Sequence, residues 1–322
     1  QGFLVIKKLC DRVGKSVSRH CVRLLSLLLD QLKERRIWTG KEDLFPAIAS
    51  CCAACKDTLE ADDLVTLDKI PLTPKRIINS IIEESKRTSS SAKEYQRRAL
   101  TSVAQLLETF CPPLDIFSEL FPYVKSLIQA ISEATGEGNS FVSKEIDPKK
   151  RAEEEKEASL QRARSKLVQA ECFRILGAAW PIQFATQQCF LEEVLDLFVG
   201  ELKIANWNSK VKILGAVKGF VSRIFVLGAE DDMGNGNKFS LLTSEVVHRL
   251  LDSVGPCVND PKYHIVRETA LSALEEIILR VKGTDHAAHH KRFILDILKG
   301  RENDSQTKLQ VSRISAALAA LQ

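Results

Sequence analysis

The feature that most constrains the fold of this chain is a helical motif that recurs along it. An apolar residue is followed by a small or apolar residue at +4, an apolar residue at +5 and another near +8. These spacings fall on one face of an α-helix, so each occurrence predicts an amphipathic helix with a buried stripe. In chain order the motif is formed by Val17, Cys21, Val22 and Leu25; Tyr95, Ala99, Leu100 and Val103; Val168, Cys172, Phe173 and Leu176; Val211, Gly215, Ala216 and Gly219; Val266, Ala270, Leu271 and Leu274; and Val311, Ser315, Ala316 and Ala319.

The distances between the last five motifs indicate a structural repeat. Their first residues are separated by 73, 43, 55 and 45 positions, and two of these steps fall within the ~40–47 residues of HEAT and armadillo repeats. The two longer steps contain segments of unusual composition, residues 135–158 and residues 228–239. We interpret the first as a charged flexible insertion that becomes helical towards Ala158, and the second as a flexible acidic, glycine-containing loop.

Segments between the motif-bearing helices carry apolar stripes of their own, which predicts helix pairs. No segment shows a sustained alternation of period two, so strands are not expected. The predicted fold is all-α, a HEAT/armadillo-like α-solenoid in which about six antiparallel helix pairs form a single superhelix over residues 1–322. The partner stripes are Leu191, Val194, Leu195 and Phe198; Leu241, Leu242, Val246, Val247, Leu250 and Leu251; and Phe293, Ile294, Ile297 and Leu298.

The pairing phase before residue 90 stays open. The stretch LFPAIASCC at residues 44–52 resembles LFPYVKSLI at residues 120–128, which indicates the first helix of a pair. In contrast, WTGK at residues 38–41 resembles WNSK at residues 207–210, which precedes a second helix.

The helix that contains Val266 shows how a repeat is expected to work. Proline after Asp260 is typical of a first helical turn, and Lys282-Gly283 is typical of a helix end. A small side chain at Ala270 allows a neighbouring helix to approach closely, whereas Arg267 and Glu268 are expected at the polar edge. One helix pair buries too little apolar surface to be stable, so stacking must supply the remaining contacts.

Charge and cysteine content narrow the possible functions. The formal net charge of +4 in 322 residues is too small for a generic nucleic-acid binder. No apolar run approaches the ~20 residues that span a bilayer, and the start lacks the length and flanks of a signal peptide. Nine cysteines in mostly apolar surroundings indicate reduced, buried thiols of an intracellular protein. Because the chain begins with Gln, we expect a fragment of a longer protein.

Two clusters have residue types suited to chemistry, and each has a structural alternative. Cys52 and Cys55 have the spacing of a redox motif, but they follow an apolar helical stretch, which favours the core. A zinc site would need a second ligand pair, which does not follow nearby. His286, His289 and His290 next to Asp285 could hold a transition metal weakly, but a solvated helix start with an acid near its positive end is the favoured interpretation. GNGN at residues 234–237 lacks the context of a phosphate loop and indicates a turn.

Candidate partner-binding residues lie in the charged segment from Lys144 to Lys166. Its mixed signs argue against a polybasic membrane or nucleic-acid patch and favour a solvated segment. A docking role is the alternative, with Lys149, Lys150 and Arg151 as its most basic part. Trp180 and Trp207 are expected at helix ends, unless one of them is an exposed anchor for a partner. No nucleophile–base arrangement is recognisable in the sequence, so no catalytic residue is assigned.

The stretch from Asp260 to Leu271 resembles the HEAT-repeat consensus. Three further stretches resemble the carboxyl-terminal region of the proteasome adaptor and scaffold family (ECPAS), which consists of large HEAT-repeat proteins. They are WTGKEDLFPAIASCCAAC from Trp38, LGAAWPIQFATQQCFLEEVLDLF from Leu176 and VRETALSALEEIILRVK from Val266.

The resemblance implies a non-enzymatic adaptor without a cofactor, located in cytoplasm and nucleus. Such a protein binds the regulatory-particle ATPases and core-particle subunits of the proteasome, helps hold the two particles together, and takes part in assembly quality control and stress regulation. It implies no nucleic-acid partner and no direct membrane insertion, and we expect the chain to be monomeric on its own. An importin-type transport receptor or a kinase or phosphatase scaffold would use the same architecture.

Overall fold

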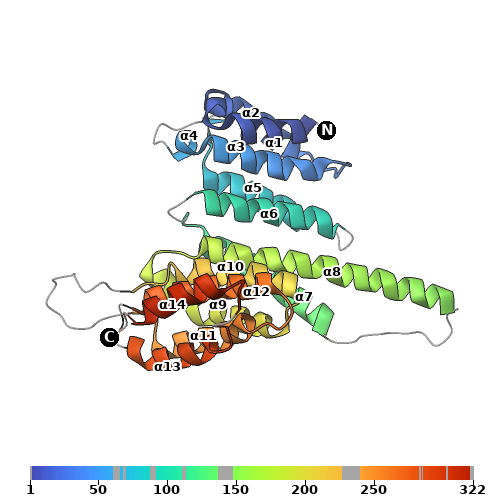
Figure 1. Cartoon of the computed structure of the whole chain (residues 1–322). Helices are drawn as coiled ribbons and strands as arrows, with labels where there is room; N and C mark the ends of the chain where they lie inside the picture. The colour runs from blue at the N-terminus through green and yellow to red at the C-terminus, as the bar shows by residue number, and fades with distance from the viewer. Residues whose placement is uncertain are drawn as a thin grey trace. The chain divides into compact units, whose positions relative to one another are not determined.

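The chain folds into two compact helical units, residues 1–175 and 176–322 (Figure 1). The single solenoid expected over residues 1–322 stays a prediction. This division is compatible with a repeat fold, because each helix pair contacts only its neighbours and compactness is local. The computed structural model describes residues 2–60, 66–67, 70–87, 92–110, 114–136, 148–226, 240–282, 284, 286–301 and 304–319.

Unit 1 is built from helices with one short hairpin. The helix α8 begins in this unit, and its last turn belongs to unit 2. The elements are α1 (Gly2–Val13), η1 (Gly14–His20), α2 (Cys21–Lys33), η2 (Lys41–Asp43), α3 (Leu44–Ala54), α4 (Lys56–Glu60), β1 (Thr66–Leu67), β2 (Ile70–Pro71), α5 (Pro74–Lys86), α6 (Lys93–Thr109), α7 (Phe117–Gly136) and α8 (Pro148–Ala179).

Unit 2 continues the pattern of helix pairs. Figure 1 draws its described helices in yellow to red. Their bounds are α9 (Phe184–Ile204), α10 (Trp207–Val221), α11 (Ser244–Val258), α12 (His264–Val281), α13 (Ala287–Leu298) and α14 (Lys308–Ala319). Among these, no helix is both long enough and apolar enough to cross a membrane, and the same holds for the described helices of unit 1.

Contacts between the helices fix the pairing phase. In unit 2, α12 packs against α10 and α14, whereas α11 packs against α9 and α13, so second helices stack on second helices. In unit 1, α3 packs against α2 before it and against α6, the second helix of the next pair. Thus α3 is a second helix, as WTGK at residues 38–41 indicates. The similarity of its first turn to LFPYVKSLI is misleading, because both helix types need apolar residues there.

The predicted stripes form the core in most helices. The motif residues of α6 and α12 are all buried, and so are the stripes of α9 and α11 apart from Leu241, which is partly exposed. In α14 the motif is placed wrongly, because Val311, Ile314 and Leu318 are buried while Ser315 is exposed. The larger aliphatic side chains occupy the interface there, since they remove more apolar area from water than serine or alanine.

Two further helices deviate from the predicted stripe. In α10 the buried face includes large apolar residues outside the predicted motif, whereas the motif residue Gly215 is exposed. In α2, Val22 is 38% exposed while Cys21 and Leu25 are fully buried. The buried residues of α10 are Ser209, Ile213, Leu214, Ala216, Val217, Phe220 and Val221.

One segment predicted as irregular is partly helical, and one short hairpin was not expected. Residues 148–158 are helical from the start of α8, because alanine, glutamate and lysine there all favour helix. Residues 137–147 and 227–239, including GNGN, lie outside the described residues. The unexpected hairpin pairs Thr66 with Pro71 and Leu67 with Ile70 in antiparallel register. Strands of two residues are too short for alternation to reveal them.

A close backbone approach in unit 2 depends on Gly177 in the last turn of α8. A Cβ atom at this position would lie 2.3 Å from the carbonyl oxygen of Ala216 in α10, so only glycine permits the observed distance between these helices. Arg223 fixes the same helix end, because its guanidinium donates to the carbonyl oxygens of Gly177 at 3.0 Å and Ala178 at 2.7 Å. Trp180 is fully buried beside Phe220, with ring centroids 4.6 Å apart.

Candidate functional site

The basic residues proposed for partner binding lie in the first turn of α8. Lys150 is exposed, and the side chains of Lys149 and Arg151 lie outside the described residues. The following residues, 153–160, are all exposed, so this end of the helix faces solvent. A docking role for these residues stays a prediction.

The cysteine pair of the possible redox motif belongs to the core. Cys52 and Cys55 are at most 1% exposed, and so is Cys51. The thiols of Cys21 and Cys51 hydrogen-bond to the Cys55 sulfur, which lowers the pKa of Cys55 and raises the pKa of both donors. Burial raises the pKa of the Cys52 thiol. A catalytic cysteine needs solvent access, which these thiols lack, so the prediction that the pair belongs to the core is confirmed.

The histidines divide between solvent and core. His286 is the N-cap of α13, His289 is exposed, and His290 is buried with its Nε2 3.1 Å from the Ser244 hydroxyl. The expectation of a wholly solvated helix start is therefore wrong for His290, because its ring packs against α11. Burial, followed by the nearby His289 and His286, lowers the pKa of His290 to about 4. Asp285 lies outside the described residues; within them, no three His, Cys, Asp or Glu side chains gather to hold a metal ion.

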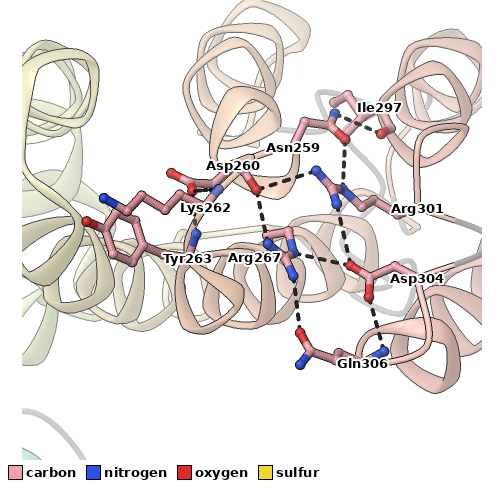
Figure 2. A network of polar contacts seen from close by, with 9 residues as sticks. All are labelled: Asn259, Asp260, Lys262, Tyr263, Arg267, Ile297, Arg301, Asp304 and Gln306. Atoms are coloured by element: carbon pink, nitrogen blue, oxygen red, sulfur yellow. Dashed lines mark hydrogen bonds and ion pairs between the residues drawn. The ribbon is translucent and has the colours of Figure 1, made fainter.

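A polar network joins the loop before α12 to the loop before α14 (Figure 2). Arg267 is only 8% exposed, and its guanidinium donates to the Asp260 carbonyl oxygen and the Gln306 side-chain oxygen, both at 3.2 Å. Its Nε lies 3.2 Å from the Asp304 carboxylate. Arg267 is thus a buried link between consecutive repeats. The prediction that it lies at the polar edge is wrong, whereas Glu268 is exposed as expected.

Asp260 organises the same loop from its other side. Its carboxylate accepts hydrogen bonds from the backbone N–H groups of Lys262 at 2.9 Å and Tyr263 at 2.8 Å. These bonds close a turn ahead of the helix, so α12 begins at His264 and Pro261 precedes its first turn instead of occupying it. The carboxylate is an acceptor in its charged form, and the pKa of Asp260 is lowered although partial burial opposes this.

Asn259 and Arg301 extend the network to α13. Asn259 donates to the Ile297 carbonyl oxygen at 3.1 Å and accepts from Arg301 at 3.2 Å. Arg301 also pairs with Asp304 at 3.4 Å. Directional bonds therefore fix two consecutive loops of unit 2 against each other, as Figure 2 shows.

An aromatic stack connects the loop between α9 and α10 to this network. The ring of Trp207, the first residue of α10, stacks on Tyr263 with centroids 5.1 Å apart and an angle of 21°. The ammonium of Lys262 lies 5.1 Å from the Tyr263 ring centroid, within the range of a cation–π contact. Trp207 is 43% exposed, so of the two helix-end tryptophans only Trp180 is fully enclosed.

Unit 1 contains a buried ion pair that sequence reasoning did not single out. Lys41 and Glu84 are 0% and 3% exposed, and the Lys41 ammonium lies 2.6 Å from the Glu84 carboxylate. Lys41 also donates to the Glu34 carbonyl oxygen at 2.5 Å, and the Tyr95 hydroxyl donates to Glu84 at 2.8 Å. Burial and the Glu84 carboxylate raise the pKa of Tyr95. The similarity of residues 38–41 to 207–210 was the only sequence signal that pointed to Lys41.

Residues 74–318 match the family described as ECM29, C-terminal ARM-like repeats. The chain belongs to this family. The human "Proteasome adapter and scaffold protein ECM29" (Homo sapiens) is 26% identical to the chain over 317 residues. The alignment covers 96% of this ECM29-family chain but only 16% of the human protein, so the chain spans a small part of its relative. The resemblance read from the three sequence stretches is thereby confirmed at the level of the family, and so is the all-α repeat fold.

Proposed function

We propose that the chain is a non-enzymatic module that binds the proteasome as an adaptor and scaffold. In this proposal it contacts the ATPase-bearing regulatory particle and the core particle, helps hold them together, and takes part in assembly quality control and stress-linked regulation. The observation that carries the proposal is the family match over residues 74–318, together with a human relative whose name is that of a proteasome adapter and scaffold protein.

The fold is suited to this role. In each unit the apolar stripes are largely buried between helices, while the outer faces of the described helices are exposed to solvent. In unit 2, hydrogen bonds and an aromatic stack hold three loops in place, so a partner meets a surface that is already ordered. Several weak contacts of this kind, used together, bind far more tightly than any one of them.

Binding to purified particles tests the proposal. The chain is immobilised and exposed separately to regulatory particle, core particle and their mixture at about 0.15 M salt. We expect each particle to bind and the mixture to dissociate more slowly than either alone, because two contacts must then break. Binding of a nuclear-transport GTPase or of phenylalanine–glycine repeats, without binding of either particle, would replace the proposal with a transport receptor.

The first turn of α8 is tested in the same assay. Reversing the charges of Lys149, Lys150 and Arg151 to glutamate is expected to weaken particle binding if these residues dock. A matched variant neutralises the exposed acidic run Glu153–Glu155 with glutamine in the same helix. Equal binding by the two variants and the unmodified chain assigns the contact to another surface.

We also propose that the chain is monomeric and distributed between cytoplasm and nucleus. Sedimentation equilibrium should give a mass near 35.9 kDa, and a concentration-dependent doubling would contradict the first statement. Imaging of the tagged protein, supported by cell fractionation, tests the second. Confinement to one compartment, or recovery with membranes, would contradict it.

A further inference from the structure

Four exposed residues of unit 2 and the half-buried Tyr263 form a surface that we call the aromatic ledge. They are Ile204 at the end of α9, Trp207 at the start of α10, and Lys262, Tyr263 and Ile265 around the start of α12. Ile204 is 70% exposed, Trp207 43% and Ile265 37%. Because exposure of large apolar side chains to water is unfavourable, several of them close together mark a surface that a partner covers.

We propose that the aromatic ledge binds a protein segment in which apolar side chains are flanked by carboxylates. The apolar side chains would cover Trp207 and the two isoleucines, and the carboxylates would meet the lysines around them. This inference concerns the chemistry of the ligand and holds for whatever assembly supplies it. Its failure would therefore leave the proposed proteasome function untouched.

The ledge is held rigidly, as a binding surface requires. Tyr263, which supports the Trp207 ring, has its N–H fixed by the Asp260 carboxylate. The Asp260 carbonyl oxygen in turn accepts from Arg267, which is anchored on Asp304. Figure 2 shows Lys262 and Tyr263 at one end of this network. A tryptophan presented on a fixed support loses little conformational entropy on binding, and this is the usual character of an interface hot spot.

The charges around the ledge determine which partner fits. Residues 202–212 contain three lysines and no acidic residue, and residues 259–265 add one lysine and one aspartate. The carboxylate of that aspartate, Asp260, is engaged by two backbone N–H groups of its own turn. In the part of the chain that the structure describes, neither Lys203 nor Lys262 is paired with a carboxylate. The rim is therefore positive, and carboxylates are its complement.

A single-stranded nucleic acid is the other ligand that stacks on aromatic rings beside lysines. Two observations favour a peptide instead. Trp207 and Tyr263 already stack on each other, so their inner faces are not open to a base. The flanking exposed residues, Ile204 and Ile265, are aliphatic, and aliphatic side chains suit an apolar side chain better than a phosphate backbone.

Fluorescence anisotropy of labelled decapeptides tests the inference on the whole chain. The probe has two central leucines flanked by glutamates; one control peptide has lysines in place of the glutamates, and another has serines in place of the leucines. We expect the acidic, leucine-containing peptide to bind at least tenfold more tightly than either control. An oligothymidylate of about ten nucleotides is titrated in parallel.

Variants locate the binding surface. Trp207→Ser and Ile204→Ser are expected to weaken the peptide at least fivefold, and Lys203→Glu with Lys262→Glu is expected to do the same and to reduce the salt dependence. Leu309→Ser is the matched control, because Leu309 is an 80% exposed aliphatic residue of α14 outside the ledge. Ile204 is largely in solvent, so its replacement leaves folding intact, which circular dichroism verifies.

Several results would overturn the inference. They are the absence of peptide binding at about 1 mM, equal binding of the three peptides, and equal effects of Ile204→Ser and Leu309→Ser. Tighter binding of the oligothymidylate than of the acidic peptide would also overturn it and would assign the ledge to nucleic acid.

Discussion

Replacing Gly177 by alanine is expected to destabilise unit 2, although alanine favours helix. The added Cβ would lie 2.3 Å from the carbonyl oxygen of Ala216, and 2.8 Å from its Cα. Both atoms belong to the backbone of α10, so no side chain can turn away. The two helices must separate by about 1 Å to restore van der Waals contact, which weakens dispersion along the whole contact.

The size of the effect follows from two opposing terms. Overpacking of this kind costs roughly 1–3 kcal/mol, and the rigidity of the opposing backbone favours the upper end. The higher helix propensity of alanine returns about 1 kcal/mol. We therefore expect Gly177→Ala to lower the free energy of unfolding by about 2 kcal/mol, the difference between these terms.

Gly215 supplies the matched control. It lies in α10, is exposed, and a Cβ atom there would meet nothing within 4 Å. Gly215→Ala should therefore raise the free energy of unfolding by about 0.5–1 kcal/mol, because only the propensity term applies. The two substitutions are chemically identical, so opposite changes in the free energy of unfolding can be attributed to the close approach of α8 and α10 at Gly177.

Urea unfolding followed by tryptophan fluorescence measures both variants. Trp38→Phe and Trp207→Phe in every protein leave Trp180 as the reporter, which is buried beside Phe220 in the same unit. Linear extrapolation gives the free energy of unfolding for each variant. If Gly177→Ala stabilises the protein as much as Gly215→Ala does, α8 and α10 do not approach as described and the reasoning fails.

Three further predictions concern buried polar groups. Glu84→Gln leaves the buried Lys41 ammonium without its carboxylate, so this change should lower the free energy of unfolding by about 3–5 kcal/mol in urea unfolding. Lys41→Met should cost less, because Glu84 keeps the Arg87 guanidinium at 3.2 Å and the Tyr95 hydroxyl at 2.8 Å, and Lys41→Met with Glu84→Leu should also cost less than Glu84→Gln. Burial lowers the pKa of His290 from 6.5 to about 4, so the unfolded chain takes up a proton first as pH falls, and the free energy of unfolding declines from pH 6.5 to about pH 4. His290→Gln should remove up to about 3 kcal/mol of this decline. Melting temperatures measured against pH test this, and a profile unchanged by the substitution would contradict it. Iodoacetamide should alkylate exposed Cys189 in the folded protein, as peptide mass spectrometry would show, while fast labelling of the buried thiols would contradict the structure. The protected thiols are Cys10, Cys21, Cys51, Cys52, Cys55, Cys172 and Cys257.

Helices and most of their buried faces were predictable, because the helical period is a local property of sequence. In α12, Val266, Ala270 and Leu271 are all fully buried as the spacing predicts. In α14 the same spacing selected Ser315, which is exposed, instead of Ile314. Spacing alone does not distinguish these two residues, whereas side-chain size decides which of two neighbouring faces is buried.

The interactions between repeats were not predictable, because their partners are far apart in the sequence. Arg267 and Gln306 are 39 positions apart, and Lys41 and Glu84 are 43 positions apart. No periodicity connects such pairs, so the sequence alone predicts that a charged residue beside an apolar stripe is exposed to solvent. The aromatic pair of Trp207 and Tyr263 was unpredictable for the same reason. Trp207 was recognised as a possible anchor, but its support on Tyr263 depends on how two repeats stack.

The two buried cations use the same arrangement at different places in the fold. Lys41, before α3, bonds the Glu34 carbonyl oxygen of its own loop and the Glu84 carboxylate of the next helix pair. Arg267, early in α12, bonds the Asp260 carbonyl oxygen of its own loop and lies against Asp304, before the next second helix.

Apolar stripes attract without direction, and stripes as degenerate as those of α10 and α14 allow neighbouring helices to slide. A buried cation bonded on both sides forbids this, because any shift of register would leave its charge unpaired at a cost of several kcal/mol. We therefore infer that the stripes make the repeats adhere, whereas Lys41 and Arg267 determine the register in which they stack. The position of Trp207 over Tyr263, and with it the shape of the aromatic ledge, depends on that register.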